Sequence, residues 1–209
     1  MKVVLFDWDG TLFDVFDFLY DTYTAVFRRY GLTPWRRQDY RNRFRSDWRG
    51  LLKEMGLAPH EDALISLWDQ NKSSASLRMH RQAKHVLSRL HEDVTLGIVS
   101  AAPAAVLARE LKQQGVADLF DVVVAYEDTD AHKPDPLPLT HALTQLNTLP
   151  AQAVYVGDMA EDIQAAHAAG TTAVAVTWGI HSQHVLAKQK PTFTAHTFTE
   201  LEEYIQGLP

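Results

Sequence analysis

A short apolar run near the N-terminus leads directly into an acidic turn, and this stretch constrains the fold more than any other. Residues 3–6, Val-Val-Leu-Phe, have the β-branched and aromatic character of a strand buried on both faces. Asp7 and Asp9 follow at once, and Gly10 supplies the permissive backbone that a tight turn needs. Parallel sheets bind ligands at the carboxyl ends of their strands, so this acid pair falls where a site is expected.

The acid pair also has an electrostatic requirement. Two carboxylates so close repel each other, so their charge has to be offset by a cation, a lysine or a shared proton. Mg²⁺, held by one or two carboxylates and completed by a substrate phosphate, meets that requirement. An Asp-x-Asp-Gly turn is also common as an ordinary surface turn, so the motif alone leaves both interpretations open.

Downstream of residue 77, short apolar runs alternate with segments of helical periodicity. The runs predict strands at residues 94–99, 120–125, 153–156 and 172–176, with a short edge strand at 191–194. Helices are predicted around Val86, at 104–114, 137–146 and 160–169, and at 199–205. Strands that alternate with helices imply right-handed crossovers. We therefore predict an α/β fold with a Rossmann-like parallel sheet core and helices on both faces.

The segment between the first two predicted strands has a different character. Its aromatic and aliphatic residues recur at helical spacing, and no part of it has the pattern of a strand. We predict three helices there, the second running unbroken from Pro34 to about Gly56. The expected organisation is an α-helical cap domain at residues 15–76, inserted into an α/β core domain formed by residues 1–14 and 77–209.

Polar residues follow the later strands at the edge of the sheet that carries the acid pair. Ser100 follows the second strand, Lys133 lies in the loop after the third, and Asp158 follows the fourth. Asp162 comes one helical turn later and therefore shares the face of Asp158. Each residue alone is typical of a turn or a helix cap. Their order and shared edge favour a single site.

These segments resemble the motifs of the haloacid dehalogenase superfamily of phosphohydrolases. The matching residues are Asp7-Trp8-Asp9-Gly10-Thr11-Leu12, Ser100, Lys133-Pro134 and Gly157-Asp158-Met159-Ala160-Glu161-Asp162. The resemblance covers essentially the whole chain, because the helical insert lies where the family has its C1-type cap. It is closest to small capped phosphatases of the phosphoglycolate phosphatase and β-phosphoglucomutase type. It implies a core strand order of 3-2-1-4-5.

The resemblance implies chemical roles for the matched residues. Asp7 is the expected nucleophile, which forms an aspartyl phosphate, and Asp9 is the expected general acid and base. Ser100 and Lys133 are expected to bind phosphoryl oxygens, and Lys133 also to shield the acids. Thr11 is expected either to orient Asp9 or to bind the phosphoryl group. The backbone amides of the turn around Gly10 can form a nest for that group.

Mg²⁺ is the cofactor that the resemblance implies. Asp7, Asp158 and the backbone carbonyl of Asp9 would hold it, and Asp162 would act mainly through water or Lys133. One departure from the family concerns the second motif, where an Asn or Gly is often found beside the serine. Alanines 101 and 102 stand there, so one polar contact expected of the family is missing.

The second predicted helix is rich in arginine. Arg37, Arg41, Arg45 and Arg49 recur every four residues beside its apolar stripe. A charged row of this kind is commonly a solvated face. Alternatively it leans over the cleft, where Arg41 and Arg45 would bind a second anionic group of the substrate.

Composition excludes several classes of function. With 209 residues, 46% of them hydrophobic, the chain can bury a substantial core. Its net charge of −6 argues against a nucleic-acid partner. The absence of cysteine excludes disulfides, thiolate nucleophiles and cysteine zinc sites, and the ten histidines form no metal set. No stretch approaches the ~18 apolar residues of a membrane span. We expect a cytoplasmic protein, monomer or homodimer, that acts on a small phosphorylated metabolite.

The favoured hypothesis is a Mg²⁺-dependent phosphatase that hydrolyses a small phosphomonoester, phosphoglycolate-like or a sugar phosphate, through an aspartyl phosphate. The alternative enzyme is a phosphomutase of the β-phosphoglucomutase type, which excludes water better. A dehalogenase is disfavoured because Asp9 suits protonation of a leaving group. A phosphoacceptor regulatory domain uses similar residues but has no reason for a sixty-residue cap. The identity of the phosphomonoester and the oligomeric state stay open.

Overall fold

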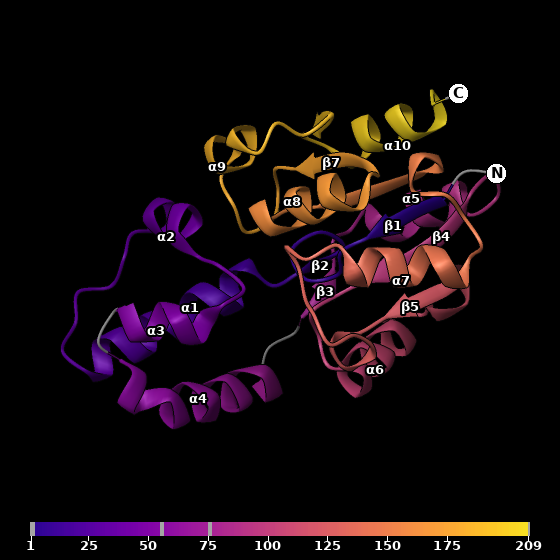
Figure 1. Ribbon diagram of the computed structural model, residues 1–209. Coiled ribbons are helices and arrows are strands. Elements are labelled where there is room, and N and C mark those ends of the chain that lie inside the picture. The colour runs from indigo at the N-terminus through magenta and orange to yellow at the C-terminus, as the bar shows by residue number, and fades with distance from the viewer. Residues whose placement is uncertain (1–2, 55–56, 75–76, 209) are drawn as a thin grey trace.

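The computed structural model describes residues 3–54, 57–74 and 77–208, and its centre is a sheet of six parallel strands (Figure 1). The strands are β1 (Val3–Phe6), β4 (Thr95–Val99), β5 (Val122–Val124), β6 (Ala153–Gly157), β7 (Thr172–Val176) and β8 (Phe193–Ala195). Their order across the sheet is β5-β4-β1-β6-β7-β8. Among the core strands this is the expected order 3-2-1-4-5, with a sixth strand beyond the fifth. The predicted α/β fold with a Rossmann-like parallel sheet is confirmed.

The central position of β1 determines where its acidic turn lies. Phe6 is in register with Ile98 of β4 on one side and Val156 of β6 on the other. The amide of Asp7 continues the ladder by donating to the Val156 carbonyl at 2.9 Å. The chain therefore leaves the sheet between two neighbouring strands that end at the same edge.

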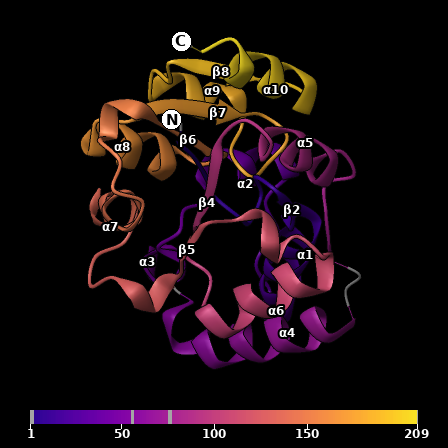
Figure 2. The same ribbon diagram turned by 90° about the vertical axis from the view of Figure 1, so that its right-hand side faces the viewer.

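Helices cover both faces of the sheet. They are α5 (Ala83–Leu90), α6 (Ala104–Gln114), α7 (Leu137–Gln145), α8 (Ala160–Ala169), α9 (Gln183–Lys188) and α10 (Phe198–Gln206). Because side chains alternate along a strand, Val4 and Phe6 pack with α5, α6 and α10, whereas Val3 and Leu5 pack with α7, α8 and α9. Figure 2 shows α5 and α7 on opposite sides of β4. Short 3₁₀ turns occur at Ala58–His60, Ala117–Leu119, Tyr126–Asp128 and Pro150–Gln152.

Four further helices lie between β1 and β4 in the chain, beyond the carboxyl end of β1 (Figure 1). They are α1 (Phe16–Arg29), α2 (Arg37–Arg43), α3 (Trp48–Glu54) and α4 (Glu61–Ser74). Two short antiparallel strands, β2 (Phe13–Asp14) and β3 (Arg78–Met79), pair where the chain leaves and re-enters the core. Neither this pair nor α9 is predicted by the sequence pattern. The division into core and cap stays a prediction, and its boundaries at Met1, Ser76 and Pro209 lie outside the described residues.

The predicted unbroken second helix is wrong, because two short helices occupy its place. At Phe44 the backbone turns to φ −58° and ψ 147°, which ends α2. The Asp47 carboxylate then accepts a hydrogen bond from the Gly50 amide at 2.9 Å, so it caps the start of α3. An aspartate inside a helical pattern competes for backbone amides in this way. The predicted end at Gly56 lies outside the described residues.

None of the helices in the described part of the chain combines the length and the apolar character needed to cross a membrane.

Candidate active site

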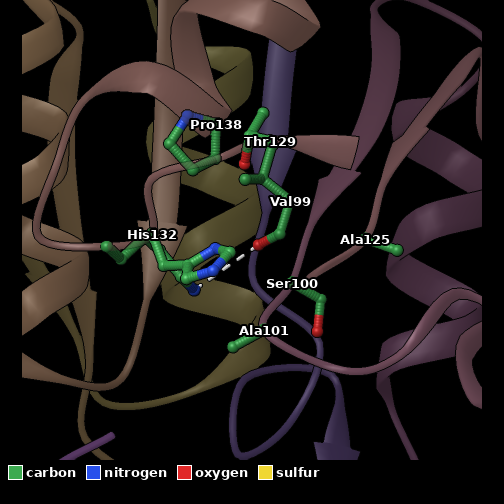
Figure 3. A pocket seen from close by; sticks show the side chains of 8 residues that line it. Val99, Ser100, Ala101, Ala125, Thr129, His132 and Pro138 are labelled. Carbon is green, nitrogen blue, oxygen red and sulfur yellow. Dashed lines mark hydrogen bonds between the residues drawn. The ribbon is translucent and has the colours of Figure 1, made fainter. Parts of the chain in front are cut away.

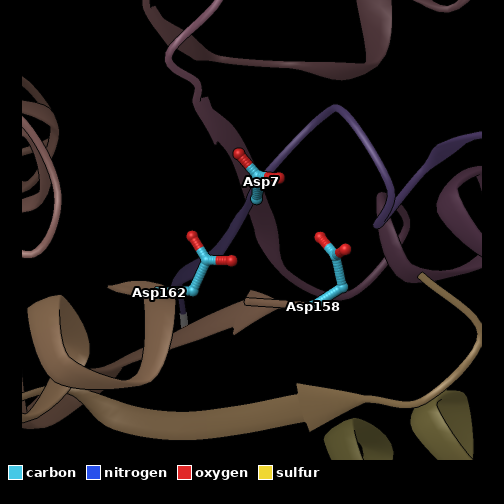
Figure 4. A group of neighbouring side chains, drawn as sticks. All are labelled: Asp7, Asp158 and Asp162. Atoms are coloured by element: carbon cyan, nitrogen blue, oxygen red, sulfur yellow. The ribbon is translucent and has the colours of Figure 1, made fainter. Parts of the chain in front are cut away.

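Three buried carboxylates meet at the edge of the sheet (Figure 4). Asp7 follows β1, Asp158 follows β6, and Asp162 lies in the first turn of α8. One oxygen of each lies within 4.8 Å of the others. The structure therefore brings together residues that are far apart in the chain, as expected for strands that end at one edge.

Lys133 joins this group from the loop between β5 and α7. Its Nζ donates to Asp7 Oδ1 at 2.6 Å, to Asp162 Oδ1 at 2.7 Å and to the Tyr155 hydroxyl at 2.9 Å. Burial alone would lower the pKa of Lys133, but the carboxylates of Asp162 and Asp7 outweigh it and raise that pKa well above its ordinary value. The ammonium is therefore held in its charged form.

One ammonium faces three carboxylates, so the cluster carries excess negative charge. Burial raises the pKa of Asp7 well above its ordinary value, although Lys133 opposes the shift. Burial, followed by the charge of Asp162, raises the pKa of Asp158 to about 7. A bound divalent cation would lower the pKa of both carboxyl groups by offsetting their negative charge. Converging carboxylate oxygens are the donors that Mg²⁺ prefers, so the residues present fit this ion.

The carboxylate of Asp158 is held from four directions. The Thr11 hydroxyl donates to Oδ1 at 2.9 Å, and the Ile180 amide donates to Oδ2 at 2.6 Å. Gly10 and Gly179 pack their backbones against the same side chain, because a Cβ at either position would lie 2.3 Å from Asp158 Oδ2. Gly10 also has a φ of +89°, which favours glycine. The orientation of Asp158 is thus tightly fixed.

Two hydrogen bonds hold residues of the acidic turn. The Thr11 hydroxyl donates to Asp158, and its expected roles toward Asp9 or the phosphoryl group stay predictions. The Gly10 amide donates to the Phe13 carbonyl at 2.8 Å, where the turn closes with a bridge between Asp9 and Phe13. The phosphate nest expected from the amides around Gly10 stays a prediction.

Asp9 and Asp162 occupy different positions relative to the cluster. Asp9 lies two residues after Asp7 and is half-buried, and its carboxylate is outside the three-carboxylate group. Its expected role as a carbonyl ligand and as an acid and base stays a prediction. Both oxygens of Asp162 are engaged, Oδ1 by Lys133 and Oδ2 by the Met159 amide at 2.9 Å. This arrangement agrees with a role for Asp162 mainly through Lys133.

A small pocket lies beside the cluster (Figure 3). It is lined by Val99, Ser100, Ala101, Ala125, Thr129, His132, Lys133 and Pro138. The buried Ser100 hydroxyl accepts a hydrogen bond from the Ala102 amide at 3.1 Å, and an accepting hydroxyl keeps its own hydrogen to donate. Since Lys133 also contacts Asp7, the pocket adjoins the nucleophile predicted from the sequence.

The two arginines predicted to bind a second anion have protein partners. The Arg41 guanidinium donates to the Gly179 carbonyl and lies 3.8 Å from the centre of the Phe16 ring. Arg45 forms an ion pair with Glu54 at 2.8 Å. The predicted row along one helix face is wrong, because the chain leaves helical geometry between the two arginines.

Some residues of the site carried no signal in the sequence. Tyr155 lies inside an apolar strand, where it has the pattern of a core residue, yet its hydroxyl accepts from Lys133 and donates to the Val99 carbonyl at 3.0 Å. Ile180 contributes only its backbone amide, which a side-chain pattern cannot indicate.

Comparison with known proteins gives the family. The model of the haloacid dehalogenase-like hydrolases matches residues 4–176, which is most of the chain. The chain belongs to this family. The predicted family and its hydrolase class are confirmed.

Alignments of this hydrolase with known proteins cover different shares of the chain. It is 27% identical to the pyrophosphatase PpaX of Bacillus thuringiensis, an alignment that covers 96% of this chain and 94% of that protein. The PpaX sequence of Caldanaerobacter subterraneus is 34% identical over 131 residues, which are 62% of this chain and 60% of that one. The crystal structure of a predicted phosphoglycolate phosphatase from Haemophilus somnus has 22% identity and a TM-score of 0.77, covering 99% of this chain and 98% of that one. At this identity the structural likeness concerns the fold.

Proposed function

We propose that this hydrolase is a Mg²⁺-dependent phosphatase that acts on a small phosphorylated compound through an aspartyl phosphate on Asp7. The observation that carries the proposal is the 2.6 Å contact between the Lys133 ammonium and Asp7, inside a buried group of three carboxylates. Family membership and the activities named for the relatives support it.

The reaction has two steps. In the first, a carboxylate oxygen of Asp7 forms a bond to phosphorus while the bond from phosphorus to the leaving oxygen breaks. Asp9 gives its proton to that leaving oxygen. In the second, a water oxygen attacks phosphorus and gives its proton to Asp9, the bond to Asp7 breaks, and inorganic phosphate leaves. Both aspartates return to their starting states.

The site has to offset electrostatic repulsion, because an anionic nucleophile must approach an anionic phosphate. Asp7 and Asp158, with the backbone carbonyl of Asp9, would hold Mg²⁺, which supplies positive charge to both reactants. Lys133 holds Asp7 in place and offers positive charge toward the phosphoryl oxygens. Ser100 offers a hydroxyl from the adjoining pocket.

The substrate is either a phosphomonoester or pyrophosphate. The resemblance of the sequence motifs favours a phosphomonoester. Pyrophosphate enters as a second candidate because a relative aligned over 96% of this chain is named a pyrophosphatase. Both reactions require the same nucleophile, so the assignment of Asp7 does not depend on which one is preferred. A phosphomutase would return an isomer with little free phosphate, and a phosphoacceptor regulatory domain would not turn over.

The test measures phosphate release with Mg²⁺ from phosphoglycolate, pyrophosphate and a set of sugar phosphates. Asp7→Asn serves as the blank because it removes the nucleophile and nearly preserves the shape of the side chain. Activity should fall to background in this variant. Acid quenching during turnover, followed by mass spectrometry, should find phosphate on the peptide that carries Asp7. Full activity of Asp7→Asn would disprove the assignment of the nucleophile.

A further inference from the structure

The loop between β7 and α9, residues 177–182, connects the insert helix α2 to the carboxylate of Asp158. On its insert side, the Gly179 carbonyl accepts a hydrogen bond from the Arg41 guanidinium. The Ser182 amide donates to the backbone carbonyl of Arg41 at 3.3 Å. On its core side, the Ile180 amide donates to Asp158 Oδ2 at 2.6 Å. Arg41 and Asp158 therefore hold neighbouring residues of one short segment.

Further contacts fix this loop between the insert and the core. The Ser182 hydroxyl donates to Asn42 Oδ1 at 2.6 Å. His181 Nδ1 accepts from the Ala160 amide at 2.9 Å, so the ring carries its hydrogen on Nε2 and donates it to the Phe44 carbonyl at 2.6 Å. The β7–α9 loop is thus hydrogen-bonded to both partners at several adjacent residues.

The backbone of Gly179 packs closely against the side chain of Asp158. A Cβ on Gly179 would lie 2.3 Å from both Cβ and Oδ2 of Asp158. Real Cβ atoms essentially never approach heavy atoms so closely, and close-packed interiors transmit displacement. Because the Gly179 backbone packs directly against Asp158, we expect a shift of Gly179 to change the position of the Asp158 carboxylate.

Arg41 is well placed to control that shift. Its guanidinium carbon lies 3.8 Å from the centre of the Phe16 ring, and an N–H of the same group donates to the Gly179 carbonyl. Arg41 is half-buried, and this burial, followed by the charge of Arg37, lowers the pKa of its guanidinium. A hydrogen bond from a partly desolvated cation is stronger than one at the surface.

We propose that Arg41 is a positioning residue that sets the Asp158 carboxylate through Gly179 and Ile180, so that metal binding and the docking of α2 against the loop favour each other. The inference rests on the proposed function, because it takes Asp158 as a metal ligand. By linkage, any gain in metal affinity from the docked insert appears equally as a gain in docking when the metal binds.

The positioning role predicts that removing Arg41 weakens Mg²⁺ binding, whereas electrostatics alone predict that it strengthens Mg²⁺ binding. The Arg41 charge and the Asp158 charge act on each other, so Arg41 lowers the negative potential at the cluster. Deleting the cation would by Coulomb's law strengthen the binding of Mg²⁺. Loss of the positioning contact would weaken it. The sign of the change in affinity therefore separates the two effects.

The experiment is isothermal titration of the intact, substrate-free protein with MgCl₂. Arg41→Met should bind Mg²⁺ about tenfold more weakly than the wild type, the effect typical of losing an outer contact of a metal ligand. Arg41→Lys keeps a donor and should recover part of the loss. The matched control is Arg37→Met, because Arg37 lies one turn earlier on α2, pairs with Asp17, and lies over the rings of Phe16 and Tyr20, 4.8 and 5.0 Å from their centres. Its affinity should stay within twofold of the wild type.

The reciprocal effect is read by hydrogen exchange of the Ser182 amide, which bonds to Arg41. Saturating Mg²⁺ should slow this exchange in the wild type and much less in Arg41→Met. Thermal unfolding checks that each variant is folded. If Arg41→Met does not fold, Asn42→Ala, which removes the acceptor of the Ser182 hydroxyl, takes its place, with a smaller loss of affinity expected.

The outcomes are distinguishable. Unchanged or tighter Mg²⁺ binding by Arg41→Met, with normal binding by the wild type, overturns the positioning role and leaves the proposed phosphatase intact. No Mg²⁺ binding by the wild type overturns the metal-dependent function, and the positioning role with it. A tenfold loss in Arg41→Met with an unaffected Arg37→Met supports both.

Discussion

The indole N–H of Trp8 donates a hydrogen bond to Glu110 Oε2 at 2.9 Å, across 102 positions of sequence. Trp8 stands between the two aspartates of the acidic turn and is fully buried, in a stack with Phe13 at 5.2 Å. The bond to Glu110 adds an attachment of the turn to α6, which covers one face of the sheet.

Removing the acceptor of this bond should destabilise the protein. Glu110→Leu leaves the buried indole N–H without its partner, which should lower the free energy of unfolding by about 1–3 kcal/mol. Glu110→Gln keeps an acceptor oxygen and should lose much less. Urea unfolding of both variants checks the difference. Equal losses would mean that the charge of Glu110, and not its bond to Trp8, stabilises the fold.

Lys133→Met should nearly abolish turnover. The substitution keeps much of the side-chain volume but removes the charge that opposes the raised pKa of Asp7. That pKa should rise further, so that less of the nucleophile is ionised at neutral pH. We expect kcat to fall by about 10²–10³, as for the loss of a charge-stabilising donor. The pH profile of kcat should move to higher pH, a shift that loss of phosphate binding alone would not cause.

The stability of the metal-free protein should fall as the pH rises from about 4 to about 7. Asp158 has a pKa of about 7 in the folded chain, above its unfolded value of about 3.9. Between these values the folded state binds more protons than the unfolded state, so raising the pH favours unfolding. Thermal unfolding in EDTA measures the trend. The trend should be flatter in Asp158→Asn, and Mg²⁺ should restore stability at neutral pH in the wild type.

Two glycine substitutions should separate backbone strain from steric clash. Gly10 (φ +89°) and Gly31 (φ +71°) both adopt left-handed backbone. A Cβ at Gly10 would lie 2.3 Å from Asp158, whereas one at Gly31 would meet no atom within 4 Å. Alanine at either position should cost about 1–2 kcal/mol of stability from the backbone.

Only Gly10→Ala should also lose activity and Mg²⁺ affinity, because only there does the new methyl group displace the carboxylate. Phosphate release and Mg²⁺ titration of the two variants provide the readout. Similar losses of activity in both would point to strain in general and against a specific contact between Gly10 and Asp158.

The core of the fold follows from local sequence patterns. The predicted helices at 104–114 and 160–169 and the strand at 172–176 coincide with α6, α8 and β7. Their signals are strong because apolar runs of strand length are bounded by turn residues, and both helices are followed by glycine. The acid residues could be placed together for the same reason, since buried parallel strands end at a common edge.

The insert and the supporting contacts of the site were harder to predict. The sequence keeps a helical spacing of apolar residues through residues 37–54, so it does not reveal the break at Phe44 or the new helix start that Asp47 caps. The partners of Arg41 and the bond from Ile180 to Asp158 depend on backbone groups brought from distant parts of the chain. Patterns of side chains contain no information about such contacts.

The interruption at Phe44 has a consequence for how the insert is seated. Within a continuous helix the carbonyl of this residue would accept from an amide one turn later. Because α2 ends here, the Phe44 carbonyl oxygen instead accepts a hydrogen bond from the imidazole of His181. A continuous helix would contact the core through its side chains alone, and substitutions readily alter side-chain contacts. Two shorter helices with a break between them also offer main-chain atoms, so part of the contact between the insert and the core does not depend on which side chains surround it.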